Sequence, residues 1–409
     1  MPQTRYGTSP WLGAVPVKKR PEFPAFKGNI TAPLVIIGGG MTGCMTAQAC
    51  AAAGLKVMLL EAHRIGQGGT ARASGFLSSE ACESFRDLDE RTGRRAARAL
   101  FEESSRAPRE LAAAVKRLGI KTDLQLADAL RVIPAGQLDK LLRRDAADRD
   151  EAGLHAPWQL PAALMRATGV PSAGGVRLKD WGFVDPYRLA LGFAAAAVKR
   201  RAKFFERSRV TRITFDRKVA TIALENGSTI VTGAAVLCTG EPTELVKALR
   251  RHFRFEDRYT VMTEPLPAAV RAEIGKRAGI LCDTESPAHR LWWTADHRAV
   301  ISGADQRRPA ARLREATLVQ RTGQLMYELS RLYPPISGAA PAFGWDTPLA
   351  HSVDDCLYAG THRNFPHQHM AFGTLHDPAR AFLASRILLR SIQGEADKTD
   401  QFFSFSRNL

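Results

Sequence analysis

The chain has 409 residues, of which 45% are apolar and 24% charged, so its composition is that of a folded globular protein with room for two or three domains. It carries 58 Lys and Arg against 41 Asp and Glu, a formal charge of +17. No apolar run approaches the ~18 residues that a membrane span needs. No zinc-finger, RNA-binding or basic-zipper pattern accompanies the charge, so we expect no nucleic-acid partner, while contact with an anionic membrane surface stays open.

The six cysteines favour a reducing compartment. None of them forms a C-x-x-C pair, and their spacing fits neither a zinc site nor a disulfide framework. The first residues lack the positive region and apolar core of a secretory signal. We therefore expect a cytoplasmic protein without a metal site, and peripheral attachment to a membrane stays open.

The N-terminal third begins with residues 1–30, whose five prolines and five Lys or Arg predict an extended arm. Residues 33–37 form a short apolar run that is typical of a buried parallel strand. A glycine cluster, an Ala-rich helical run to Ala53 and a second apolar run at 56–60 follow. This order predicts one β-α-β unit.

The remainder of the chain predicts helices first and then short strands. A loop rich in Gly, Ser and Thr is expected over 64–80, and another rich in Gly, His and Pro before the last helix. The turn at 225–227 is typical of a hairpin. Helices are predicted at 84–118, 137–152, 186–198, 311–332 and 378–391, and strands at 210–215, 220–224, 229–232 and 235–237, through 255–305 and near residue 357.

The glycine cluster at 38–43 has the spacing G-x-G-x-x-G and lies between a predicted strand and a predicted helix, the context in which this pattern binds a dinucleotide. Gly38 permits the tight turn, Gly40 lets the backbone approach a diphosphate, and Gly43 lets the helix pack on the strand. Glu61 ends the second strand, where its carboxylate is placed to accept hydrogen bonds from ribose hydroxyls. The motif suits NAD and FAD alike.

The stretch from Val35 to Glu61 resembles the N-terminal fingerprint of FAD-dependent oxidoreductases of the D-amino-acid oxidase and sarcosine oxidase superfamily. The loop at 68–75 is similar to the second flavin-contacting loop of that family, and Asp185-Pro186 followed by 209–213 is similar to its mid-chain unit. The strand end at 235–240 is similar to the A-T-G strand end of the family. The resemblance extends from residue 33 through nearly all of the remaining chain.

The resemblance implies an α/β fold, with a Rossmann-type FAD-binding domain whose parallel sheet is discontinuous in sequence, and a substrate or cap domain built on an antiparallel sheet. We expect the arm at 1–30, the FAD domain at 31–110, 180–252 and 340–409, and the cap at 111–179 and 253–339. No cysteine stands where the family attaches flavin, so FAD is expected to bind non-covalently. The expected FAD-binding residues are Gly38, Gly40, Met41, Thr42, Gly43, Glu61, Ala62, Gly69, Thr70, Arg72, Ala73, Ser74, Gly75, Val210, Cys238, Thr239, Gly240, Gly360, Gly373, Thr374, Leu375 and His376.

The family's chemistry implies oxidation of the C–N bond of an amine or amino acid, with hydride transfer to flavin N(5) and hydrolysis of the imine. Alternation along a predicted cap strand puts Arg290 and Trp292 on one face and Trp293 on the other. We expect Arg290 to clamp a substrate carboxylate, and Trp292 or Trp293 to wall an apolar substrate pocket. His376 is expected to contact the flavin ring, and Arg72 to tune it.

Two departures from the family pattern leave alternatives open. The turn at 373–378 carries side chains where the family keeps a glycine-rich backbone against the flavin. No lysine occurs between Lys276 and Lys398, although sarcosine-oxidase-like members use one to activate oxygen, so a quinone or carrier protein is favoured as acceptor over oxygen. The alternatives are a flavin-dependent dehydrogenase of a hydroxy acid or other C–H donor, and a catalytically silent flavin- or nucleic-acid-binding protein. The oligomeric state stays open.

Overall fold

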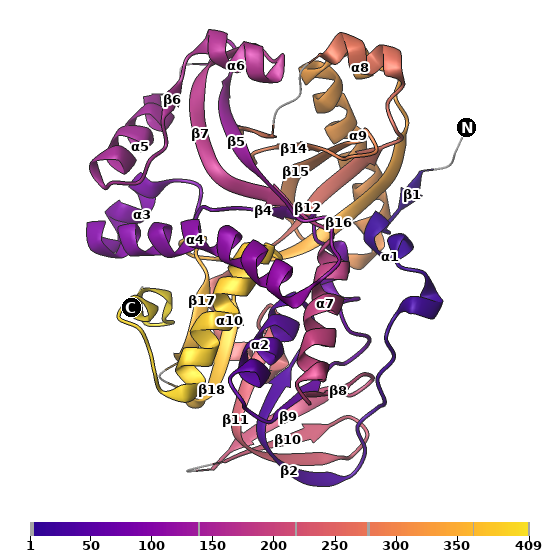
Figure 1. Cartoon of the computed structure of the whole chain (residues 1–409), viewed down its shortest axis with the longest axis vertical. Helices are drawn as coiled ribbons and strands as arrows, with labels where there is room; N and C mark the ends of the chain where they lie inside the picture. The colour runs from indigo at the N-terminus through magenta and orange to yellow at the C-terminus, as the bar shows by residue number, and fades with distance from the viewer. Residues whose placement is uncertain (1–3, 138–139, 217–218, 276–278, 363, 408–409) are drawn as a thin grey trace.

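The computed structural model describes residues 4–137, 140–216, 219–275, 279–362 and 364–407. Two large sheets organise the molecule, an eight-stranded sheet in the lower half of Figure 1 and a ten-stranded sheet in the upper half. The chain passes between them several times, so each sheet is assembled from segments that are distant in sequence.

The eight-stranded sheet has the parallel core that the β-α-β unit predicts. Strand β2 (Asn29–Ile37) leads through helix α2 (Met41–Ala52) to the parallel strand β3 (Val57–Leu60). Side chains of β2 alternate between two buried clusters, which explains its continuous apolar run. The other strands are β8 (Lys203–Phe205), β9 (Val210–Phe215), β10 (Ala220–Leu224), β11 (Thr229–Gly240), β17 (Tyr358–His362) and β18 (Phe365–Phe372), in the order β17-β18-β11-β2-β3-β8 with β10 and β9 attached to β11.

Helices cover one face of this sheet. Helix α2 packs between α7 (Pro186–Lys199) and α10 (Pro378–Gln393), and α4 (Arg94–Leu118) packs on α10. Each of α7 and α10 begins with an Asp–Pro pair, and each aspartate accepts two backbone N–H bonds as an N-cap. No helix within the described ranges is both long and apolar enough to cross a membrane.

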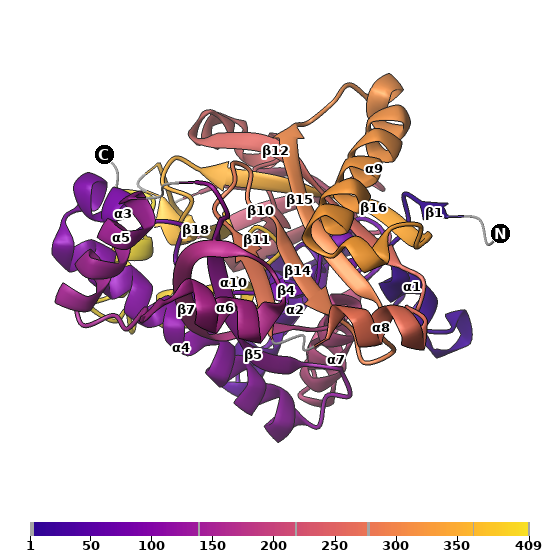
Figure 2. The same cartoon turned by 90° about the horizontal axis from the view of Figure 1, so that it is seen from above.

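The ten-stranded sheet is mainly antiparallel and packs its two faces differently. One face carries α9 (Arg314–Leu332), with α6 (Pro161–Thr168) and α8 (Ala268–Ile274) beside it; the other meets the eight-stranded half through an aromatic cluster. Figure 2 shows α8 and α9 at one end and α3 (Phe85–Thr92) and α5 (Lys140–Glu151) at the other. Its strands are β1 (Arg5–Tyr6), β4 (Phe76–Leu77), β5 (Gln125–Pro134), β6 (Trp158–Gln159), β7 (Ser172–Phe183), β12 (Phe253–Thr263), β13 (Ile280–Asp283), β14 (Arg290–Trp293), β15 (Ala299–Arg307) and β16 (Pro341–Ser352).

Three local predictions need correction. The helix expected over 84–118 is two helices, α3 and α4, separated at Gly93, whose φ of +82° is not helical. The two strands expected over 229–237 are the single strand β11. The strand expected near residue 357 is β17, but the Gly-, His- and Pro-rich stretch expected as a loop after it contains β18, because parallel pairing of β18 with β11 outweighs its weak local propensity.

The N-terminal segment is more structured than an extended arm. It contains β1, which pairs with β16, and the short helix α1 (Pro10–Ala14), whose Trp11 is buried. Strand β16 belongs to the ten-stranded sheet, although the sequence predicts the cofactor domain from residue 340 onward. Local patterns do not show which sheet a strand joins, since its partner β12 lies far away in sequence.

Candidate active site

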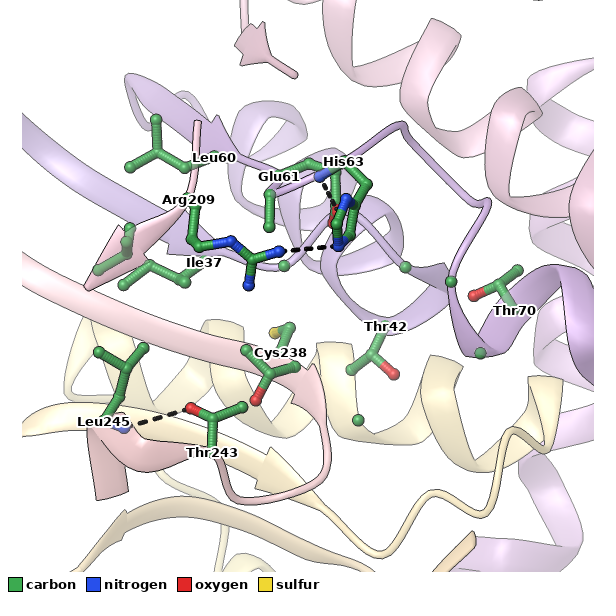
Figure 3. A pocket seen from close by; sticks show the side chains of 18 of the residues that line it. Ile37, Thr42, Leu60, Glu61, His63, Thr70, Arg209, Cys238, Thr243 and Leu245 are labelled. Carbon is green, nitrogen blue, oxygen red and sulfur yellow. Dashed lines mark hydrogen bonds between the residues drawn. The ribbon is translucent and has the colours of Figure 1, made fainter. Parts of the chain in front are cut away.

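A cleft of about 480 Å³ lies at the carboxyl ends of β2, β3 and β11 (Figure 3), the edge where open α/β sheets bind ligands. Its walls come from the glycine turn after β2, the end of β3, the loop before η2 (Gly69–Arg72), the start of β9 and the end of β11. The turn before α10 closes one end of the cleft.

The glycine turn is a cradle that side chains would fill. Gly38 has φ +105°, and a Cβ there would lie 2.5 Å from the carbonyl oxygen of Cys238. A Cβ on Gly43 would lie 1.9 Å from the carbonyl oxygen of Gly38. Gly40 caps α2 with extended backbone and lines the cleft, and the first N–H of the helix, that of Met41, donates to Thr70 Oγ1 at 2.8 Å. This arrangement fits a diphosphate, because bare backbone and a helix N-terminus both favour it.

Glu61 stands at the other wall of the cleft, at the end of β3. Its carboxylate accepts the backbone N–H of Gly39 at 2.7 Å and that of His63 at 2.8 Å. A carboxylate offers about four acceptor positions, so it can still accept ribose hydroxyls. Arg209 lies beside it, with Nη2 2.9 Å from Nε2 of His63 (Figure 3).

The turn before α10 puts side chains where the cleft ends. Leu375 and His376 both adopt left-handed backbone, with φ of +51° and +53°. The His376 ring lies on Gly69, where a Cβ would be 2.1 Å from Cε1. Burial, and then the charge of Arg72, lower the pKa of His376 to about 4, so the imidazole is neutral near pH 7.

Arg72 does not reach this cleft. Its guanidinium pairs with the buried carboxylate of Asp346 on β16, which Arg314 also binds at 3.0 Å, and its Nε donates to the Asp346 carbonyl oxygen at 2.9 Å. Burial lowers the pKa of Arg72, and Asp346 opposes that shift. The contacts anchor the loop of residues 69–75 to the ten-stranded sheet rather than place a cation in the cleft.

The N-terminal segment holds the same loop from another side. Ser9 Oγ donates to the carbonyl oxygen of Ala71, and Trp11 Nε1 donates to that of Ala73 at 2.8 Å. A Cβ on Gly75 would lie 3.1 Å from the Trp11 indole. The sequence alone did not predict this contact, and its only signal was a tryptophan in a Pro-rich segment.

A small inner chamber of about 50 Å³ separates this loop and turn from the ten-stranded sheet. Ser74 and Leu375 line it from the cleft side, and Arg258 and Arg290 line it from the sheet. Arg258 binds Asp305 through three contacts of 2.6–3.0 Å. Among the described residues, the one carboxylate that pairs with Arg290 is that of Glu83, at 3.6 Å. Burial, followed by the charge of Arg258, lowers the pKa of Arg290.

The structure confirms that Trp292 and Trp293 lie on opposite faces of β14. It does not confirm that Trp292 lines a substrate pocket. Trp292 shares a cluster with Trp181 and Phe183, and Trp293 packs on Tyr333 on the opposite face at a centroid distance of 5.3 Å. Trp292 stacks on Phe183 at 5.4 Å and is 7% exposed, and it lines neither the cleft nor the chamber. It is a core residue.

A group of three ligand-type side chains lies deeper in the ten-stranded sheet. Atoms of Glu256, Asp305 and His351 lie within 4.8 Å of one another. Asp305 is already bound by Arg258, and Arg254 Nε donates to Glu256 at 2.7 Å. The group is therefore an ion-pair network beneath Arg258.

The predicted cofactor residues fall into three sets. Those lining the cleft are Gly38, Gly40, Met41, Thr42, Glu61, Ala62, Gly69, Thr70, Val210, Cys238, Thr239, Gly240, Thr374 and His376. Ser74 and Leu375 line the inner chamber, and Gly43 packs beneath the turn. Among the described residues, Arg72, Ala73, Gly75, Gly360 and Gly373 line neither space.

Several residues that line the cleft were not predicted from the sequence. Most of them lie within two positions of a predicted residue. Thr243, Glu244 and Leu245 follow β11, and only the folded structure shows that they reach the cleft. The missed residues are Ile37, Leu60, His63, Gly68, Ser208, Arg209, Thr211, Thr243, Glu244 and Leu245.

Comparison with known proteins agrees with this geometry. The family described as DAO, FAD dependent oxidoreductase, matches residues 33–374. The probable oxidoreductase OrdL of Haemophilus influenzae is 21% identical over 389 residues, covering 93% of this chain and 87% of its own. The gamma-glutamylputrescine oxidoreductase of Escherichia coli is 27% identical over 202 residues, 49% of this chain and 47% of its own. The crystal structure of glycine oxidase from Geobacillus kaustophilus superposes with a TM-score of 0.75 at 16% identity, covering 94% of this chain and all (100%) of that one.

Proposed function

The chain belongs to the FAD dependent oxidoreductase family. We propose that it oxidises the C–N bond of an amino acid, or of another amine that carries a carboxylate, and that this carboxylate binds Arg290. FAD is its cofactor, and the chain is an oxidoreductase. The observation that carries the proposal is Arg290 itself, a guanidinium beside the cofactor turn whose nearest carboxylate is 3.6 Å away.

The cleft fits FAD, and different residues of the cleft bind different parts of the cofactor. The turn at Gly38 and the N-terminus of α2 bind the diphosphate, and Glu61 accepts from ribose. When bound, FAD supplies the two-electron acceptor of the reaction. Burial raises the pKa of the Cys238 thiol to about 12, so this cysteine of the cleft is a poor nucleophile, which fits the non-covalent binding of FAD that we propose.

Arg290 binds and orients the substrate at the inner chamber. A guanidinium presents paired N–H donors that match a carboxylate, and few competing contacts hold this one. Arg258, which also lines the chamber, is paired with Asp305 and is therefore less available to the substrate than Arg290. The neutral form of the substrate amine is the form that loses a hydride, and the arginines that line the chamber disfavour a second positive charge beside them.

The acceptor of the electrons is proposed to be a quinone or carrier protein. Residues 299–303 lie in β15, which contains no lysine. The lysine that activates oxygen in sarcosine-oxidase-like members therefore has no counterpart there. Anaerobic reoxidation by a soluble quinone, measured against oxygen consumption, tests this part of the proposal.

The experiment on the main proposal is anaerobic reduction of the purified holoenzyme. Amino acids, secondary amines and hydroxy acids are added in turn, and the flavin band near ~450 nm is followed. We expect bleaching by amino acids and not by hydroxy acids. Arg290→Met is expected to raise KM at least ~100-fold, about 2.7 kcal/mol, while FAD content stays unchanged. Bleaching by hydroxy acids alone, or an unchanged KM in the variant, would overturn the proposal.

A further inference from the structure

A second cavity, of about 400 Å³, continues outward from the inner chamber. It lies among α3, α5, β5 and the connection from β13 to β14, on the side of the molecule where Figure 1 shows α3 and α5. It shares Glu83, Arg131, Trp181 and Arg290 with the chamber, so the two spaces adjoin. The FAD cleft does not include any of these four residues. The cavity is therefore the route outward from Arg290.

Charge in this cavity is divided along its length. Arg131 and Arg290 lie at the inner end, and Arg131 is 8% exposed, with Nη1 donating to the carbonyl oxygen of Glu83 at 2.7 Å. Glu83 lies at the inner end as well, beside Arg290, whereas the carboxylates of Asp87 and Glu285 belong to exposed residues that line the cavity but not the chamber. A ligand with a negative inner end and a positive outer end matches this division.

The other charged groups of the cavity are already neutralised. Asp145 accepts from Arg149 Nε at 2.7 Å, and Asp283 lies 2.7 Å from His289 Nδ1. Arg86 pairs with carboxylates outside the cavity.

Asp87 and Glu285, at the solvent-exposed mouth of the cavity, are the two acids that are not neutralised in this way. Across the described part of the chain they form no ion pair, although the protein carries a charge of +17. The Glu285 side chain accepts a hydrogen bond from the neutral amide of Gln137, at 2.9 Å. A cation from outside the chain is the missing partner.

The wall offers a second, independent sign of a ligand. Trp181 lines both the cavity and the chamber and is 1% exposed, and its Nε1–H has no acceptor within the described residues. Its ring lies 6.0 Å from the Arg290 guanidinium. A buried donor without an acceptor is unfavourable, and a substrate carboxylate at Arg290 brings oxygen atoms to this wall.

We propose that the cavity selects amino acids with a cationic side chain. The carboxylate binds Arg290, the side chain runs outward past Trp181, and its ammonium or guanidinium group meets Asp87 and Glu285. This inference rests on the proposed function and narrows its substrate class to basic amino acids.

The test compares arginine with citrulline, which has nearly the same shape without the charge. Both enantiomers of each are added anaerobically to the holoenzyme, and flavin reduction gives kcat/KM. We expect a preference of ~30-fold or more for arginine, falling as salt is added because partly exposed charges are screened. The double variant Asp87→Asn with Glu285→Gln is expected to bring the ratio to within about threefold of one without changing the value for citrulline.

Asp150→Asn on α5 is the matched control, because Asp150 is exposed and lies outside the cavity; it should leave the ratio unchanged. Equal use of both substrates, or a ratio that the double variant does not alter, overturns the inference and leaves the proposed function intact. If no amino acid reduces the flavin, the proposed function fails instead. Perturbation of the FAD absorption spectrum by arginine and by citrulline then still decides whether the cavity distinguishes charge.

Discussion

The FAD cleft and the outer cavity are built by opposite means. The cleft is shaped by backbone: glycines without side chains, the N-terminus of α2, and Glu61, which is tied to two N–H groups. The outer cavity is shaped by charged side chains from α3, α5, β5, β13 and β14, and two of its acids lack an ion-pair partner within the described residues. The glycine turn therefore tolerates almost no added atoms, whereas the charges that we propose to select the substrate can be exchanged one at a time.

The largest effect is expected at the glycine cradle. Gly43→Val adds a branched side chain where even a Cβ would lie 1.9 Å from the Gly38 carbonyl oxygen, so helix α2 must move away from the turn. We expect FAD affinity to fall by a factor of ~10³ or more, about 4 kcal/mol. The ratio of flavin to protein absorbance after gel filtration measures it.

Gly323→Ala in α9 is the control for this variant. No atom lies within 4 Å of the added Cβ, and the change removes a glycine from a helix interior. It should raise the free energy of unfolding by about 1 kcal/mol and leave FAD content alone. Equal FAD loss in both variants would show that the cleft depends on general stability rather than on its cradle.

The second effect tests whether the cleft depends on side chains after all. Trp11→Ala removes the indole that packs on Gly75 and donates to the Ala73 carbonyl oxygen. We expect a loss of about 3 kcal/mol in the free energy of unfolding, together with faster FAD release. Trp11→Phe keeps most of the packing and loses the hydrogen bond, so it should cost only about 1 kcal/mol. Urea unfolding and flavin release after dilution would separate the two; no change in FAD release would limit Trp11 to a role in stability.

The third prediction concerns Asp185, where the chain passes from β7 of the ten-stranded sheet into α7, which covers the eight-stranded sheet. Asp185 is buried as the N-cap of α7, and desolvation raises its pKa from 3.8 to about 6. Because the folded state favours the protonated form, this contribution to stability is complete below pH 3.8 and is lost as the pH rises through 6. Asp185→Asn keeps a capping oxygen without the charge and should be more stable than the wild type by about 2 kcal/mol at pH 8. Urea unfolding at pH 4 and 8 measures this, and an equal difference at both values would contradict it.

The smallest effect concerns the turn that divides the two regions. His376→Gly removes a ring that lies on Gly69 and relieves one left-handed residue. We expect a gain of up to about 1 kcal/mol in the free energy of unfolding, with FAD bound at least as tightly. Weaker FAD binding in this variant would instead mean that the imidazole contacts the cofactor directly. Isothermal titration of the apoprotein with FAD distinguishes the two results.

Local sequence patterns predicted the FAD cleft far better than the contacts around the outer cavity. Residues 35–61 predicted the β-α-β unit and the turn because strand, glycines, helix and acid follow one another within a single folding unit. The pattern at β14 also predicted correctly which face carries Arg290 and Trp292. It did not predict that Phe183 covers Trp292, or that Asp346 holds Arg72 away from the cleft, since both partners lie more than 100 residues away.

By itself, therefore, the sequence determined the fold class, the FAD cradle and the position of Glu61, all of which depend on backbone freedom and short-range periodicity. The tertiary structure alone decided which arginine stays available. Asp346 pairs with Arg72 and Asp305 with Arg258, whereas in the described part of the chain the partner of Arg290 is Glu83 alone, at 3.6 Å. Tertiary contacts also determine which sheet β16 joins. They determine, too, which acids at the mouth of the cavity have no cationic partner among the described residues. The physical reason is that ion pairing depends on distances of a few ångströms between strands that the sequence separates by dozens of residues.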